Sequence, residues 1–168
     1  MTILRTVFLS LHAASGVLGL VLGAFAFRLP ETRDFRPWFA RAYAATLVSL
    51  TVLLSATVVL DWTRISTMQQ VVYAVLVGLA VVIVTRIFLG LRAAAGRPAG
   101  WREKYLNHVY FTYISLWEGF FIVGLIDLDA PGWLVGAVAV GVVVLGAAVF
   151  NRYKSSVLAG TSAEVVAS

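Results

Sequence analysis

Five long apolar runs dominate the chain, and each is about as long as a lipid bilayer is thick. They cover residues 4–27, 38–60, 71–91, 105–126 and 132–150. A helix needs about 20 residues to cross a hydrocarbon core of about 30 Å. Lipid leaves no water to satisfy backbone groups, so runs of this length predict helices. We therefore predict an all-α, five-helix transmembrane bundle that forms one domain over residues 1–150, followed by a tail at 151–168.

The composition excludes several other classes of protein. Hydrophobic residues make up 61% of the 168 residues and charged residues only 12%, whereas soluble domains carry about 25% charged residues. The spans leave too little chain for a large catalytic domain outside the membrane, so we favour a non-enzymatic role. The absence of cysteine excludes disulfides, thiolate metal sites and cysteine nucleophiles. The net charge of +5 comes from basic residues at the ends of the runs, so we expect a lipid bilayer as partner and no nucleic acid.

Basic residues are distributed unequally between the two sides of the predicted bundle. Most of them lie in the segments after the first and third runs, at the start of the second run and in the tail: Arg28, Arg33, Arg36, Arg41, Arg92, Arg97, Arg102, Lys104, Arg152 and Lys154. The opposite side has only Arg5 and Arg64. Short loops rich in lysine and arginine stay in the cytoplasm. We therefore predict an N-terminus outside, a cytoplasmic C-terminus and tail, and a multi-pass protein of the plasma membrane.

The first run carries a histidine and three glycines on one helical face. His12, Gly16, Gly19 and Gly23 recur at spacings of four, three and four residues. Glycines at such spacing let a neighbouring helix approach closely, and the pair at 132 and 136 repeats the pattern in the fifth run. These faces predict helix packing, either within the chain or against a second copy or a partner membrane subunit.

The fourth run is the most polar, and it contains an acid. Glu118 lies more than two turns from either end of the run, where a carboxyl group is expected to face the bundle interior, paired or protonated. At about 1.5 Å per residue, its depth in the outer half matches that of His12. We predict a ligand- or proton-binding site formed by His12 and Glu118 and lined by Ser115 and Thr112.

A second polar group is expected in the inner half of the bundle. It consists of His108, Arg86 and Asn107. Arg86 either extends to the cytoplasmic headgroups or contacts a buried anion. The two histidines raise the alternative of a haem, but their different depths argue against both binding one iron within one chain. We expect no metal site, because no recognisable ligand spacing is present.

Several segments resemble a known group of proteins. Residues 11–23, the segment Ala40-Arg41-Ala42-Tyr43 and the pair Asn107-His108 are similar to the first, second and fourth helices of a family of small bacterial predicted integral membrane proteins of unknown function. The resemblance covers about residues 4–133. It implies a common fold, a bacterial plasma membrane as the location, and recurrent histidines at positions 12 and 108, and it implies no activity. Family members often carry a further histidine before the second helix, where this chain has residues 36–38 as Arg-Pro-Trp.

Three functions follow from these patterns as hypotheses. The leading one is a small-molecule or proton binding or transport module with a titratable site inside the bundle. The first alternative is a non-catalytic accessory or assembly subunit of a larger membrane complex, which would use the glycine-rich faces. The second alternative is a haem-binding redox subunit.

Overall fold

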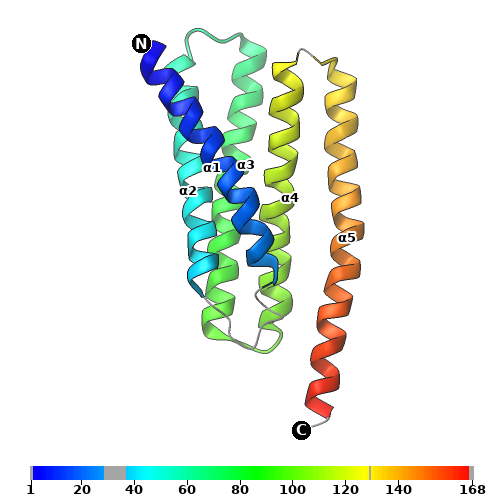
Figure 1. The fold of residues 1–168 in the computed structure, drawn as a ribbon. Coiled ribbons are helices and arrows are strands. Elements are labelled where there is room, and N and C mark those ends of the chain that lie inside the picture. The colour runs from blue at the N-terminus through cyan, green and yellow to red at the C-terminus, as the bar shows by residue number, and fades with distance from the viewer. Residues whose placement is uncertain (1, 29–36, 129, 167–168) are drawn as a thin grey trace.

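The computed structural model describes residues 2–28, 37–128 and 130–166, and the regular elements in these ranges are all α-helices. Five helices follow one another (Figure 1): α1 (Thr2–Arg28), α2 (Pro37–Asp61), α3 (Thr67–Gly96), α4 (Trp101–Asp127) and α5 (Gly132–Val166). All five are long and apolar enough to cross a membrane. The predicted all-α, five-helix transmembrane bundle is thereby confirmed. The orientation of its termini stays a prediction.

The helices extend beyond the apolar runs that predicted them. Helix α3 begins four residues before its run, where the Ser66 hydroxyl accepts from the Gln69 backbone N–H and the Gln69 side chain accepts from the Ser66 N–H. This capping box satisfies backbone donors that the first turn leaves free. Helix α5 continues past Phe150 to Val166. Apolar runs mark the part of a helix that suits lipid, whereas the helix ends only where its backbone hydrogen bonds end.

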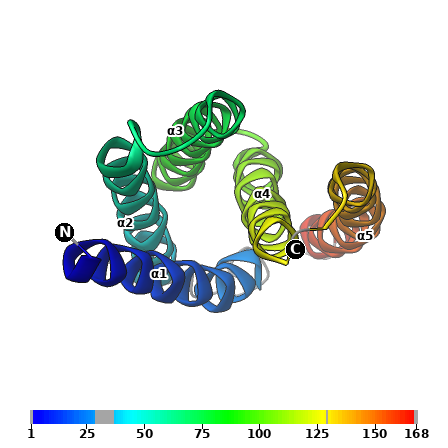
Figure 2. The same cartoon turned by 90° about the horizontal axis from the view of Figure 1, so that it is seen from above.

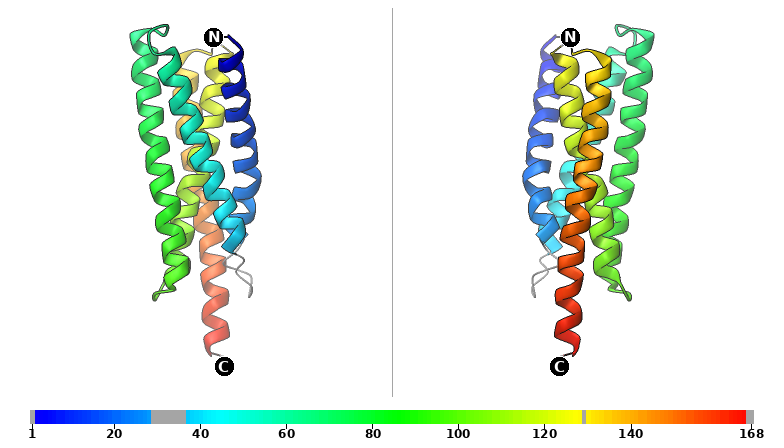
Figure 3. Two further views of the ribbon diagram at one scale, coloured as in Figure 1. Left: turned by 90° about the vertical axis from the view of Figure 1, so that its left-hand side faces the viewer. Right: turned by 90° about the vertical axis from the view of Figure 1, so that its right-hand side faces the viewer.

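The first four helices surround a common centre, and α5 lies outside them. Seen along the bundle, α2 and α4 lie opposite one another, with α1 and α3 between them on either side (Figure 2). Helix α5 packs against α4, and its C-terminal part extends past the ends of the other helices (Figure 3). Helix α1 is tilted relative to the other helices. It begins beside α2 and ends near α4 (Figures 1 and 2).

The tight turn between α3 and α4 defines what we call the inner end of the bundle, the end that the basic residues predict to be cytoplasmic. Helix α3 ends with Arg97 in the left-handed conformation (φ 43°), and its N–H donates to the Ala93 carbonyl at 3.0 Å. Gly100 follows with φ 69°, a value that glycine adopts without strain. The chain therefore reverses within a few residues and starts α4 at Trp101.

The buried core lies in the inner half of the bundle. It combines small residues of α1 and α2 with larger ones from α2, α3 and α4: Ala26, Ala40, Tyr43, Ala44, Leu47, Ile83, Ile87, Ala94, Tyr105, Val109 and Leu116. Alanines at positions 26 and 40 let these helices approach, and the Tyr105 hydroxyl donates to the Ala26 carbonyl at 3.1 Å. The first turns of α1 are looser, with Ile3 82% exposed.

The outer surface of the bundle is apolar. On α5, Val140, Leu145 and Val149 are each more than 60% exposed. A water-soluble protein rarely exposes so large an apolar surface, whereas lipid solvates it. Together with the five candidate spans, this surface supports a multi-pass membrane protein in contact with the bilayer.

The glycines of α1 pack inside the chain. A Cβ atom at Gly19 would lie 3.1 Å from Leu116 of α4 and 3.4 Å from the Thr46 hydroxyl of α2. Gly132 and Gly136 of α5 have no such neighbour within 4 Å in the described structure. The first glycine face therefore serves this chain's own α2 and α4, and a role for the α5 glycines in contacts between subunits stays a prediction.

Candidate functional site

His12 lies between α1 and α2, in the outer half of the bundle. Its ring is half-buried, and Nδ1 lies 3.3 Å from the carbonyl oxygen of Leu50. Because a carbonyl can only accept, Nδ1 is the donor in this hydrogen bond. One turn further along α1, the hydroxyls of Ser15 and Ser49 lie 3.3 Å apart. His12 therefore takes part in a polar contact between α1 and α2.

Glu118 lies on a different side of α4 from the one that meets α1. Helix α1 approaches α4 where Gly19 faces Leu116. Glu118 follows Leu116 by two residues, which is about 200° around a helix of 3.6 residues per turn. His12 precedes Gly19 by seven residues, or about 10 Å along α1. The structure thus shows no contact between His12 and Glu118, although both belong to the outer half.

Glu118 has no polar partner in the part of the chain that the structure describes. Its side chain is half-buried, and it forms neither a hydrogen bond nor an ion pair with a described residue. The two hydroxyl residues predicted beside it, Thr112 and Ser115, are buried within the bundle. Thr112 is engaged elsewhere, because its Oγ1 donates to the Val109 carbonyl at 2.8 Å and lies 3.1 Å from the Tyr43 hydroxyl.

Arg86 and His108 meet between α3 and α4, in the inner half. The guanidinium carbon of Arg86 lies 4.9 Å from the centre of the Phe111 ring, which is about one turn along α4 from His108. Gly90, one turn beyond Arg86 on α3, allows the close approach, since a Cβ there would lie 3.1 Å from the Cβ of His108. We call Arg86, His108 and Phe111 the Arg86 site.

Two polar groups of the Arg86 site have no partner of the expected kind in the described structure. The Nδ1 atom of His108 is buried and forms no hydrogen bond. Arg86 is exposed at the surface of α3 and forms no ion pair with a described carboxylate. Buried polar atoms and charges within a span are ordinarily satisfied. The Arg86 site is therefore, like Glu118, a place where the described structure leaves polar groups within a span without a partner.

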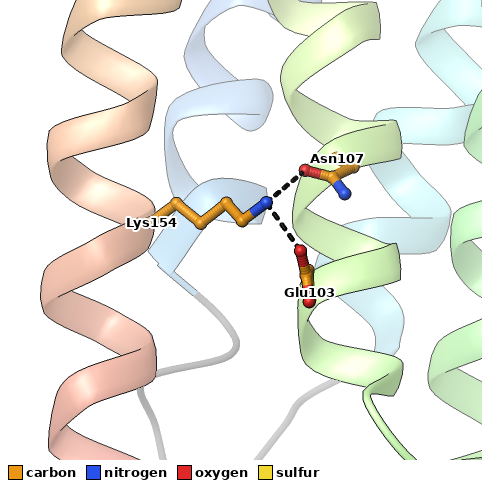
Figure 4. A network of polar contacts seen from close by, with 3 residues as sticks. All are labelled: Glu103, Asn107 and Lys154. Carbon is orange, nitrogen blue, oxygen red and sulfur yellow. Dashed lines mark hydrogen bonds and ion pairs between the residues drawn. The ribbon is translucent and has the colours of Figure 1, made fainter.

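Asn107, predicted to belong with these residues, faces α5 instead. Its side-chain oxygen accepts from Lys154 Nζ at 3.4 Å, and the same Nζ lies 2.7 Å from Glu103 Oε1 (Figure 4). Neighbouring residues on a helix point about 100° apart, so Asn107 and His108 reach different helices. Asn107, Glu103 and Lys154 thus hold the inner end of α4 against α5.

The two histidines lie at different helix interfaces. His12 is at the contact of α1 with α2, and His108 is at the contact of α4 with α3. This arrangement gives no support to one haem held by both imidazoles of a single chain. Among the described residues, no group of three or more His, Cys, Asp or Glu side chains could hold a metal ion.

Two residues that contact the candidate site residues were not predicted from the sequence. Phe111 supplies the aromatic face beneath Arg86, but one phenylalanine in an apolar run carries no distinguishing signal. Tyr43 joins Thr112 across the bundle, and its position in the Arg-x-Tyr segment of the second run was a usable signal. The partners of both residues, Arg86 for Phe111 and Thr112 for Tyr43, were identified only by the packing of the helices.

Comparisons with known proteins identified no relative of this chain. No family model matches the chain, and neither a curated protein nor a solved structure matches it. The resemblance of residues 4–133 to a family of small membrane proteins therefore stays a prediction.

Proposed function

We propose that this integral membrane protein is a binding module for a membrane-resident molecule with an acidic head, a phosphate or a carboxylate on an acyl chain. The acidic head would contact the Arg86 site between α3 and α4. The proposal rests mainly on one observation. The guanidinium of Arg86 lies within a span and has no carboxylate partner in the described structure.

The charge of Arg86 favours an anionic ligand. Arg86 lies ten residues before the end of α3 at Gly96, about 15 Å along the helix. A guanidinium at such a depth is costly unless an anion or a polar group accompanies it. Phe111 compensates part of this cost through a cation–π contact. A phosphate or carboxylate would supply two acceptors in the geometry that the guanidinium fork matches.

The direction of α3 also favours a local ligand over distant headgroups. Side chains on a helix tilt toward its N-terminus, and the N-terminus of α3 is at the outer end of the bundle (Figure 1). The backbone therefore directs the Arg86 side chain toward the outer end of the bundle. To reach the lipid headgroups at the inner surface, the side chain would have to turn back against this direction.

His108 adds a second group to the same site. Its buried Nδ1 has no hydrogen-bond partner in the described chain, and its Cβ lies against Gly90, one turn beyond Arg86 on α3. An acidic oxygen near the guanidinium would be placed to accept from this ring. Arginine and histidine together are suited to an oxyanion head, and the apolar surface of the neighbouring helices is suited to its acyl chain.

Native mass spectrometry of the protein released from phosphatidylcholine nanodiscs would test the proposal. One arm adds phosphatidic acid and the other adds oleate, which separates a lipid headgroup from a free fatty acid as the source of the acid. We expect the wild type to retain one of them and Arg86→Gln to bind it about tenfold more weakly, since a charged hydrogen bond contributes about 1.5–3 kcal/mol.

Arg92→Gln is the matched control. Arg92 is exposed on the same helix, but six residues further on its side chain points about 120° away from that of Arg86. We expect it to bind like the wild type. Equal binding by the wild type and Arg86→Gln, or an equal loss in both variants, would overturn the proposal.

A further inference from the structure

Glu118 offers a second, oppositely charged group on α4 that the Arg86 site does not use. It lies within the span Trp101–Ile126, seven residues beyond Phe111 and hence about 10 Å further toward the outer end. Its carboxyl group is half-buried and has no hydrogen bond or ion pair with a described residue. A carboxyl group within a span requires a counter-charge, a hydrogen-bond donor or a proton.

The described spans supply no lysine or arginine at this level, and His12 of the same half is bonded to Leu50 of α2 instead. Every lysine and arginine within them lies in the inner half or at the inner end: Arg41, Arg86, Arg92, Arg102, Lys104, Arg152 and Lys154. The faces of α3 and α5 that continue outward from their contacts with α4 carry apolar residues. On α3, Leu79 and Val82 precede Arg86 by two turns and one turn, and on α5, Ala139 and Val142 precede Gly146 by the same spacing. A counter-charge for Glu118 would thus come from outside the chain.

Aromatic rings surround the same stretch of α4. The ring of Trp117 stacks on Phe121 with centroids 5.6 Å apart, and it meets Phe120 edge-on at 6.1 Å. Phe120 and Phe121 are also 53% and 41% exposed toward the membrane. Phe121 lies three residues after Glu118, so the two side chains share one side of the helix. A carboxylate beside exposed aromatic rings is the combination that binds organic cations.

We infer that Glu118, with the rings of Trp117 and Phe121, binds a lipophilic organic cation that enters from the outer leaflet. The cation's charge pairs with the Glu118 carboxylate, and its apolar groups contact the two rings. The site is independent of the Arg86 site, because it lies at another depth and takes a ligand of opposite charge.

Equilibrium binding of radiolabelled tetraphenylphosphonium to the full chain in phosphatidylcholine nanodiscs tests this inference. The wild type is expected to bind the probe saturably, and Glu118→Gln to bind it about tenfold more weakly or worse. Glu118→Asp keeps the charge and is expected to retain part of the affinity. Trp117→Leu removes one ring and is expected to weaken binding severalfold.

Two control variants distinguish this site from the other acidic and basic groups. Glu103→Gln removes an acid at the inner end that already pairs with Lys154, and it is expected to bind the probe like the wild type. Arg86→Gln is also expected to leave cation binding unchanged, and Glu118→Gln to leave binding of the acidic amphiphile unchanged. These cross-controls show separately whether the cation site at Glu118 or the anion site at Arg86 is wrong.

Saturable binding that Glu118→Gln abolishes, in a variant whose thermal unfolding matches the wild type, would support the inference. The inference is overturned if the wild type shows no saturable binding, or if Glu118→Gln binds as tightly as the wild type. An equal loss in Glu103→Gln would also overturn it, because general surface charge would then explain the binding.

Discussion

The hydroxyl of Tyr43 on α2 lies 3.1 Å from Oγ1 of Thr112 on α4, and it joins two helices that face each other across the bundle (Figure 2). Both residues are fully buried. Thr112 already donates its proton to the Val109 carbonyl, so Tyr43 is the donor between the two hydroxyls. This bond crosses the core of the bundle, and α1 and α3 lie on either side of it (Figure 2).

Tyr43→Phe is expected to lower the free energy of unfolding only slightly. The substitution removes the donor but keeps the ring, and Thr112 keeps its bond to the Val109 carbonyl. Hydrogen bonds between membrane helices contribute about 0.6 kcal/mol on average, and we expect a loss of that order in unfolding by sodium dodecyl sulfate. Tyr43→Ala should lower the free energy by about 3–5 kcal/mol through the cavity it leaves.

Tyr73→Phe is the matched control for Tyr43→Phe. Tyr73 lies on α3 and forms no hydrogen bond in the described structure, so we expect no change in stability. If Tyr73→Phe and Tyr43→Phe destabilised the protein equally, the contact with Thr112 would have no special role.

Gly23→Ala is expected to destabilise the contact between α1 and α4. A Cβ at position 23 would lie 2.5 Å from Cδ2 of Tyr113 and 3.1 Å from Cε2 of Tyr43. The Tyr113 ring is held edge-on by Phe27 and Trp117, which restricts its escape. Overpacking of this kind lowers the free energy of unfolding by about 1–3 kcal/mol. Gly78→Ala has open space around it and should unfold like the wild type; a comparable loss there would contradict the steric explanation.

Glu103→Gln is expected to weaken the inner attachment of α5, and to do so only at low salt. Glu103 and Lys154 form a 2.7 Å ion pair, but their side chains are 48% and 25% exposed. Exposed pairs contribute about 0.2–1 kcal/mol and are screened by salt. Unfolding of Glu103→Gln in low and high salt should show a small loss that disappears in high salt. Arg152→Gln, at an exposed position on α5, should show no such loss, and a loss in Glu103→Gln that persisted in high salt would point to a packing defect.

Single cysteines can test the predicted orientation of the bundle. The chain has no cysteine of its own, so an introduced thiol is the one group that a maleimide labels. Thr63 lies in the exposed turn after α2, and Ala99 lies in the exposed turn between α3 and α4. In intact spheroplasts, an impermeant maleimide should label Thr63→Cys directly and Ala99→Cys only after the membrane is disrupted. The reverse pattern would place the N-terminus in the cytoplasm.

The fold could be predicted closely because lipid imposes one simple requirement on the backbone. Every apolar run of sufficient length had to be a helix, so five runs predicted five spans, and α1 to α5 contain them. The exact ends were less predictable. The capping box at Ser66 and the extension of α5 to Val166 depend on backbone hydrogen bonds, which continue where the apolar residues stop.

The contacts of the candidate site residues could not be predicted from their positions along the helices. Spacing along the chain placed His12 and Glu118 in the same layer and His108, Arg86 and Asn107 in another. It could not show which face of each helix meets which neighbour. In the structure, His12 bonds to Leu50 of α2 and Asn107 to Lys154 of α5.

The sequence by itself therefore determined the apolar surroundings that the helices require, the secondary structure and the position of each polar group along its helix, because these follow from residue type and helical rise. Only the tertiary structure decided which polar groups meet. The oblique path of α1 brings Gly19 to Leu116 and keeps His12 beside α2, while Gly90 lets α4 approach α3 and places His108 near Arg86. Such pairings depend on the rotation and crossing of whole helices, which the close packing of a few small residues sets.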